Sequence, residues 1–283
     1  MLPLTPVIKV LVIVNVVVFA LVALADGTAQ FANLSDLLAL YYPTADQFAA
    51  YQLVTHFFMH ASVTHLLMNM LGLYFLGPIV ETRLGGQRFL TLYLLAAAGA
   101  VLLHFAYIWW QVQGAESELA AFVADPSLQL LNDFFRGVPL DGLQENGRSV
   151  SSIVGNLQNQ MAMGEPSADV TTSAATLMRS YVVYLQSTPM VGASGAISGV
   201  VAAFAVFFPK EKLQLLFIPI GVPAAYMIGF FFLVDLVLGV LNLGFDNIAH
   251  FAHIGGAVTG AVLAFVWKKT TTPPWMRRID GAA

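Results

Sequence analysis

The sequence predicts an all-α fold, a polytopic membrane bundle of six transmembrane helices, from three observations. Hydrophobic residues make up 58% of the 283 residues and charged residues only 10%, whereas about 25% of the residues of a soluble domain are charged. Six apolar segments are long enough to cross a bilayer, which takes about 20 residues in a helix. Most basic residues fall between alternate segments. Because backbone groups in hydrocarbon need internal hydrogen bonds, such spans indicate helices.

The expected spans are interrupted once, by a long polar segment. They cover about residues 7–25, 61–80, 89–110, 189–209, part of 213–243, and 247–267. The first is too long for a signal peptide and is followed by Asp26 without a cleavage site. We therefore expect one membrane domain with three parts: three spans in residues 1–110, an extracytoplasmic helical insertion at 111–188, and three spans with a short cytoplasmic tail in 189–283.

The orientation in the membrane follows from the basic residues. Cytoplasmic segments of membrane proteins carry an excess of lysine and arginine. If the N-terminus lies inside, nine of the 12 basic residues fall at inner span ends or in inner segments, namely Lys9, Arg83, Arg88, Lys210, Lys212, Lys268, Lys269, Arg277 and Arg278. The other three lie in the insertion. The sequence therefore predicts that both termini are cytoplasmic.

The insertion is expected to form a small helical cap outside the membrane. Three prolines and a glycine would divide it into three or four short helices, with breaks at Pro126, Pro139, Gly155 and Pro166. One of these helices has an apolar face made of Val150, Ile153, Val154, Leu157 and Met161. Eight acidic and three basic residues give a net charge of −5, which disfavours contact with anionic lipid headgroups. A loosely ordered loop and a lid that screens substrates are the alternatives.

Polar residues recur at one depth in three of the expected spans. Such residues are costly in hydrocarbon and indicate function. They are His60, His65 and Asn69 in the second span, Ser194 and Ser198 in the fourth, and His250 and His253 in the sixth. All three spans run from outside to inside, and counting from their outer ends puts Ser194, His253 and His65 roughly 6–10 Å below the outer surface. The sequence thus predicts that a hydroxyl and two imidazoles meet at one level.

Small residues favour close packing of the fourth and sixth spans. Gly192, Gly195 and Gly199 recur in the fourth, and Gly256 and Gly260 form a G-x-x-x-G pattern in the sixth. Small residues at this spacing let helix backbones approach closely in lipid. Such an approach is what a hydrogen bond of ~2.6–3.2 Å between a serine and a histidine requires.

These residue types point to nucleophilic catalysis. A serine hydroxyl attacks a carbonyl once a neighbouring base takes its proton, and histidine titrates in the right range. Ser194 is therefore the expected nucleophile and His253 the expected base. The resulting oxyanion needs hydrogen-bond donors. His65 and Asn69 are four residues apart, share a helical face and can supply them, together with the Ser194 amide.

The same residues resemble the rhomboid intramembrane serine proteases. The likeness rests on H-x-x-x-N (His65, Asn69), G-x-S-G (Gly192, Ser194, Gly195), A-H-x-x-G-x-x-x-G (Ala252, His253, Gly256, Gly260) and E-x-R (Glu81, Arg83), in the right order along six spans. The resemblance implies a catalytic Ser194–His253 dyad and an oxyanion hole lined by His65 and Asn69. It also implies cleavage of single-pass transmembrane substrates near the outer membrane face, no cofactor, and a bacterial inner membrane.

Three features depart from the family pattern. No Trp-x-Arg element occurs between Asp26 and Tyr51, Ser198 stands where an aromatic residue is common, and the insertion is long. Asp235 or Asp246 is a further candidate, as a carboxylate that orients His253. The composition excludes a nucleic-acid partner.

Two other functions are alternatives. A catalytically inactive rhomboid-like protein would bind membrane clients without cutting them. A metalloprotease or metal transporter would use His56, His60, His65, His250 and His253, but the sequence has no H-E-x-x-H motif, so no metal is expected.

Overall fold

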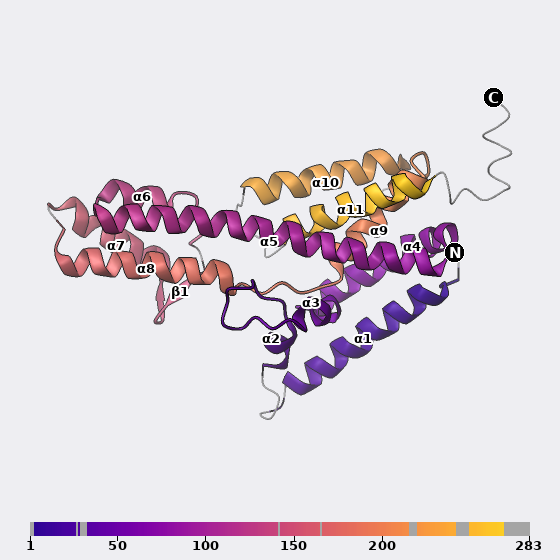
Figure 1. Cartoon of the computed structure of the whole chain (residues 1–283), viewed down its shortest axis with the longest axis horizontal. Coiled ribbons are helices and arrows are strands. Elements are labelled where there is room, and N and C mark those ends of the chain that lie inside the picture. The colour runs from indigo at the N-terminus through magenta and orange to yellow at the C-terminus, as the bar shows by residue number, and fades with distance from the viewer. Residues whose placement is uncertain are drawn as a thin grey trace.

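The computed structural model describes residues 3–26, 28, 33–140, 142–164, 166–214, 220–241 and 249–268. In these residues it is a helical protein with two short strand pairs. Figure 1 shows a bundle of long helices from one end of which a second group of helices extends. Several residues of the sequence analysis lie outside the described part, namely Asp141, Glu165, Asp246, Lys269, Arg277, Arg278 and the first residues of the sixth span.

Five helices in the described residues are long and apolar enough to cross a membrane. They are α1 (Pro6–Asp26), α4 (Val63–Leu84), α5 (Gly86–Ala124), α10 (Ala224–Leu241) and α11 (His250–Lys268). Each corresponds to an expected span. The helical membrane bundle predicted from the sequence is confirmed.

The fourth expected span is shorter than predicted. Instead of residues 189–209, helix α9 covers Ser194–Phe207, which is 14 residues or about 21 Å. Ahead of α9, Met190 pairs with Leu40 of the first outer connection through two backbone hydrogen bonds of 2.8 and 3.0 Å. As a result α9 begins at Ser194, inside the bundle.

Helix α5 continues past residue 110, where the third span is expected to end. It runs without a break for 39 residues, or about 58 Å, and so far exceeds the ~30 Å of a hydrocarbon core. The polar composition after residue 110 marks the end of the apolar span and not the end of the helix. The insertion therefore starts within a helix that also belongs to the bundle.

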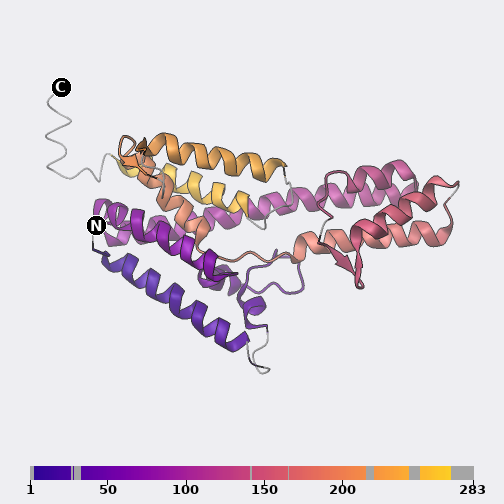
Figure 2. The same cartoon turned by 180° about the vertical axis from the view of Figure 1, so that it is seen from behind.

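The insertion folds into helices with their own core. These are α6 (Leu128–Phe135), α7 (Val150–Ala162) and α8 (Ala168–Ser187), with a hairpin of β1 (Gln144–Glu145) and β2 (Arg148–Ser149) before α7. Together with the outer half of α5 they bury a cluster that includes Phe122, Leu131, Phe134, Leu157 and Met178. Figure 2 shows the group from behind. Three of the expected breaks lie between helices, but Gly155 lies within α7, so the break predicted there is wrong.

Glycines let α9 pack against α11 at backbone distance. A Cβ atom added to Gly256 would overlap the carbonyl oxygen of Gly195, and one added to Gly260 would overlap the backbone of Gly199. On the other side of α11, a Cβ on Gly255 would overlap the carbonyl oxygen of Gly99 in α5. Helix α11 is thus held between α9 and α5, as the small residues in lipid-embedded helices allow.

The C-terminal end of α4 fixes the start of α1. Glu81, which is buried, accepts hydrogen bonds from the amides of Val7 and Ile8 at 3.1 and 3.0 Å and from the hydroxyl of Thr5. A carboxylate at a helix N-terminus satisfies amides that lack partners in the helix and complements its dipole. The Arg83 guanidinium lies 5.5 Å from the centre of the Phe207 ring and joins α4 to α9.

Two shorter connections complete the described fold. The first outer connection contains α2 (Leu34–Leu38), α3 (Gln52–Thr55) and the 3₁₀ turn η1 (His56–Phe58). Between α9 and α10, β3 (Lys212–Leu213) pairs with β4 (Val222–Pro223). The start of α1 and the end of α11 lie at the same end of the bundle (Figure 1).

Candidate active site

Ser194 and His253 lie within hydrogen-bonding distance. Ser194 Oγ is 2.9 Å from His253 Nε2, although the residues are 59 positions apart in the chain. Ser194 is the first residue of α9, so its amide has no acceptor within the helix and lies at the positive end of the helix dipole. The close packing of α9 on α11 at Gly195 and Gly256 brings the two side chains together.

Asp235 of α10 lies on the other side of the His253 ring. Its Oδ2 is 3.2 Å from His253 Nδ1, and its Oδ1 is 2.5 Å from Nδ1 of His250. Since a carboxylate only accepts, both imidazoles donate from Nδ1. His253 then carries its proton on Nδ1 and presents the lone pair of Nε2 to Ser194. The sequence analysis named Asp235 and Asp246 as candidates for this position, and Asp246 lies outside the described residues.

His65 presents an N–H toward Gly192, two positions before the serine. The Ala61 amide donates to His65 Nδ1 at 3.4 Å, and the Ser62 hydroxyl accepts from the His65 amide at 3.1 Å, which caps α4. With Nδ1 used as acceptor, Nε2 carries the proton. That nitrogen faces the backbone of Gly192, because a Cβ atom added there would lie 2.9 Å from it.

Asn69 adds a second donor at the same place. Its Nδ2 is buried and has no hydrogen-bond partner among the described residues. A Cβ on Gly192 would lie 3.7 Å from it. Gly192 itself has a φ of +116°, which an L side chain rarely adopts, and its amide donates to the His56 carbonyl at 2.9 Å. The glycine therefore allows the chain to pass directly over His65 and Asn69 just before Ser194.

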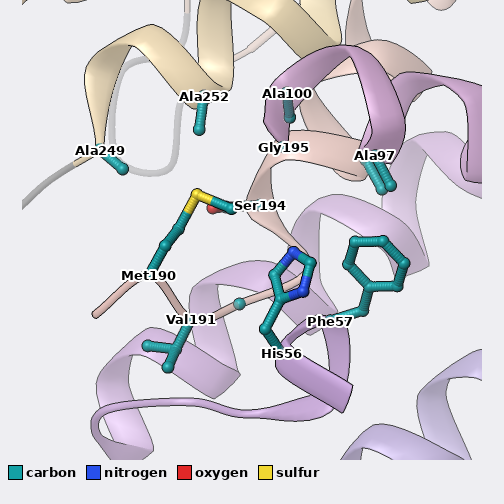
Figure 3. Close-up of a pocket in the computed structure, with 12 residues that line it drawn as sticks. His56, Phe57, Ala97, Ala100, Met190, Val191, Ser194, Gly195, Ala249 and Ala252 are labelled. Carbon is teal, nitrogen blue, oxygen red and sulfur yellow. The ribbon is translucent and has the colours of Figure 1, made fainter. Parts of the chain in front are cut away.

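A small cavity lies beside Ser194. Its volume is about 20 Å³, which is space for roughly one water molecule. Figure 3 shows His56, Met190 and Ser194 among the side chains around it. The wall on the helical side consists of small residues, Ala97, Ala100, Gly195, Ala249 and Ala252.

The two histidines before α4, His56 and His60, are buried. His56 is almost fully buried and its Nδ1 lies 2.6 Å from the Gln52 carbonyl. Burial lowers the pKa of His56 to about 4, and burial together with the neighbouring His65 lowers the pKa of His60 to about 4. Both rings are thus neutral at pH 7. Among the described residues, no three histidine, aspartate or glutamate side chains are grouped as a metal site.

Gln52 is a structural residue that the sequence analysis missed. Its buried side chain accepts from the Ala49 amide at 3.1 Å and donates to the carbonyls of Gln47 and Leu37 at 2.9 and 3.2 Å. It anchors the first outer connection, where no Trp-x-Arg element exists. A single glutamine without a surrounding pattern gives no signal in one sequence.

A sequence profile of the Rhomboid domain matches residues 47–114 and 151–270. The matched part is well over half of the chain and contains Ser194, His253, His65 and Asn69. The chain belongs to the rhomboid family. The unmatched residues 115–150 cover the outer end of α5, α6 and the hairpin.

Two rhomboid relatives are similar over parts of their length. RHOMBOID-like protein 12, mitochondrial, of Arabidopsis thaliana is 25% identical over 218 residues, which are 77% of this chain and 45% of that protein. Rhomboid protein 1, mitochondrial, of Saccharomyces cerevisiae is 30% identical over 94 residues, 33% of this chain and 27% of that protein. This rhomboid chain thus spans less than half of the relatives it matches.

The apolar helices make this rhomboid a multi-pass membrane protein. Both relatives are mitochondrial by name, which does not fit the bacterial inner membrane expected from the sequence.

Proposed function

We propose that this rhomboid is an intramembrane serine endopeptidase that cleaves single-pass transmembrane proteins near the outer membrane face. The observation that carries the proposal is the 2.9 Å contact between Ser194 Oγ and His253 Nε2. It lies at the start of a shortened helix inside an apolar bundle. A hydroxyl and an imidazole at this distance can exchange a proton in an attack on a carbonyl.

The mechanism follows from the tautomers and donors. His253 Nε2 takes the Ser194 proton as Oγ attacks the carbonyl carbon of the scissile peptide bond. The oxyanion accepts hydrogen bonds from Asn69 Nδ2, His65 Nε2 and the Ser194 amide. His253 then gives the proton to the leaving amine, which leaves an acyl-enzyme. A water molecule activated by His253 hydrolyses the acyl-enzyme and restores Ser194.

The peptide bond of an intact transmembrane helix is not open to attack, because its carbonyl is hydrogen-bonded within the helix. The substrate must therefore unwind locally. We expect cleavage at a small residue near the outer end of the substrate span, with helix-breaking residues nearby.

The proposed orientation keeps both termini on the inner side. Four helix ends that lie together in Figure 1 each carry a basic residue. These are Lys9 at the start of α1, Arg83 at the end of α4, Arg88 at the start of α5 and Lys268 at the end of α11. A shared basic end is the pattern of an inner membrane face. Ser194 and His253, in the first turns of α9 and α11, then lie toward the opposite side, to which α6, α7 and α8 belong.

The test is cleavage of a single-pass reporter by the purified full chain in liposomes, compared with the Ser194→Ala variant. We expect cleavage by the parent, none by the variant, and no effect of a chelator. A fluorophosphonate probe should label the parent and not the variant. Equal cleavage by both proteins would contradict the proposal. A parent that folds but neither reacts with the probe nor cleaves would instead be the client-binding alternative.

A further inference from the structure

Helix α10 carries an acidic side chain where its surroundings are apolar. Most of its large side chains are exposed on the outside of the bundle, including Phe230, Phe231, Leu233, Val237 and Val240. Asp235 points the other way, and only 17% of its side chain is exposed. Burying an ionisable residue in a membrane helix costs free energy, so such a residue is expected to have polar or charged partners.

Both carboxylate oxygens of Asp235 have histidine partners on α11. Oδ1 meets His250 Nδ1 and Oδ2 meets His253 Nδ1. Because His250 and His253 are three positions apart, they lie on one face of α11, and the carboxylate bridges them across the helix interface. Of these two imidazoles, His253 is the one in contact with Ser194.

Gly239 allows this bridge to form. A Cβ atom at this position would lie 2.8 Å from His250 Cβ and 3.3 Å from the Phe251 ring. The glycine follows Asp235 by one helical turn, on the same face of α10. Helix α10 therefore approaches α11 closely at the level at which the carboxylate reaches the two rings.

We infer that Asp235 is the positioning residue of His253. It holds the ring in the Nδ1-protonated tautomer that presents the Nε2 lone pair to Ser194, and it stabilises the imidazolium that forms when the serine proton is taken. His250 occupies the second oxygen and fixes the carboxylate. The site is thereby a Ser–His–Asp constellation whose acid comes from α10. This inference rests on the proposed function.

The consequence is that the base is oriented only while α10 lies against α11. Removing the carboxylate should therefore slow the chemical step without changing how substrate binds. A residue that merely holds α10 in place would act differently, because its loss would lower the amount of folded protein and leave the folded molecules fully active.

The experiment compares the full chain with Asp235→Asn in liposomes. We expect kcat and the rate constant of fluorophosphonate labelling to fall together by about 10- to 10⁴-fold, the upper end being the effect of the same change in a soluble serine protease. KM should stay within about twofold. Asp235→Glu keeps a carboxylate on α10 and should recover part of the labelling rate.

The matched control is Leu236→Asn, which places the same amide on the same helix one position away, at a side chain that is 41% exposed. It should label at the parental rate. Rate constants are compared per labelled molecule, so that misfolded protein lowers the amplitude and not the rate.

Two results would overturn the inference. One is labelling of Asp235→Asn at the parental rate, with or without a lower amplitude. The other is an equal fall in rate for Leu236→Asn. A parent that the probe does not label at all would refute the proposed function instead.

Discussion

At the scale of single residues, the site depends on which nitrogen of each histidine carries a proton. The backbone decides this for His65, since the Ala61 amide occupies Nδ1. A carboxylate decides it for His253. The imidazoles of His65 and His253 thus have opposite tautomers, one ready to donate to an oxyanion and one ready to accept from a hydroxyl.

Asn69 gives the first prediction at this scale. Its buried Nδ2 has no partner in the described residues, so Asn69→Ala removes an oxyanion donor without breaking a visible hydrogen bond of that nitrogen. We expect turnover to fall by up to about 10²- to 10³-fold with little change in thermal stability. Kinetics on the reporter and a melting curve in detergent measure the two effects. Ser198→Ala, one turn further along α9, should keep most activity. If Ser198→Ala lost more turnover than Asn69→Ala, the assignment of Asn69 as an oxyanion donor would be contradicted.

The buried histidines give a prediction about acid stability. Burial lowers the pKa of His60 to about 4, whereas the pKa of an exposed histidine is about 6.5. Between these values the unfolded chain binds more protons than the folded one, so stability is complete above about pH 6.5 and declines as the pH falls toward 4. The melting temperature should be lower at pH 4.5 than at pH 7. His60→Gln should weaken that dependence, and an unchanged slope would show that other groups cause it.

At the scale of helices, close packing is concentrated in the contacts of α11 with α9 and α5. Gly195, Gly256 and Gly260 bring backbones into direct contact, and this contact sets the distance between Ser194 and His253. Lipid offers no hydrophobic drive for helices to associate, so packing at small residues carries the association.

Gly256→Ala should therefore separate α9 from α11. The new methyl group would overlap the Gly195 carbonyl oxygen, and we expect lower thermal stability and a large loss of probe labelling. Gly229→Ala is the matched control, because it makes the same change in membrane helix α10, where the described residues place no side chain or other element within 4 Å of the added methyl group. The control should be neutral or slightly stabilising, since alanine favours helix over glycine. Equal thermal stability and equal probe labelling of the two variants would refute the packing explanation.

The sequence predicted helices better than their ends. Hydropathy identifies where the chain meets lipid, which is why α1, α4, α10 and α11 fall close to expectation. Hydropathy does not indicate where the backbone hydrogen bonds of a helix end. Helix α5 thus continues past its apolar part, and α9 begins late because residues before Ser194 pair with the first outer connection.

The candidate site was predictable where its residues form patterns. Depth, glycine spacing and the family motifs pointed to Ser194, His253, His65 and Asn69, and the structure places them together. The hydrogen bond between Asp235 and His253 could be predicted only as one of two alternatives, because it depends on how α10 is rotated about its own axis. Gln52 stands alone in the sequence and became visible only through its four hydrogen-bond partners in the first outer connection.

At the scale of the whole molecule, the described residues hold a small apolar cluster around Leu40, Met190 and Ala252 and two larger apolar cores. One lies in the membrane bundle and includes Leu73, Phe89 and Phe204, and the other joins α6, α7 and α8 to the outer half of α5. The candidate site lies where the first core meets the small cluster, because Ala196 of that core and Met190 and Ala252 of the cluster line the cavity beside Ser194. The cap, loop and lid alternatives for the insertion therefore differ in their effect on substrates rather than on Ser194.

Replacing residues 126–166 with a short Gly/Ser linker tests this separation. The change removes α6 and α7 and leaves α5 and α8 joined. We expect Ser194 to keep its reactivity toward the fluorophosphonate probe, because the helices around it keep their contacts. The range of cleaved reporters, measured by mass spectrometry of released fragments, should broaden if the helices screen substrates. Loss of labelling would show that the two cores are not independent.

Because α5 is one unbroken helix, it contributes residues to both of those cores. Gly99 contacts α11 beside the site, and Ala124 lies at the far end of α5. The two residues are 25 positions apart in one continuous helix, which is about 37 Å along its axis. Each degree of tilt at Gly99 swings the far end by about 0.6 Å. A tilt of the far half of α5 would therefore change the contact of Gly99 with Gly255, which lies two positions along α11 from His253.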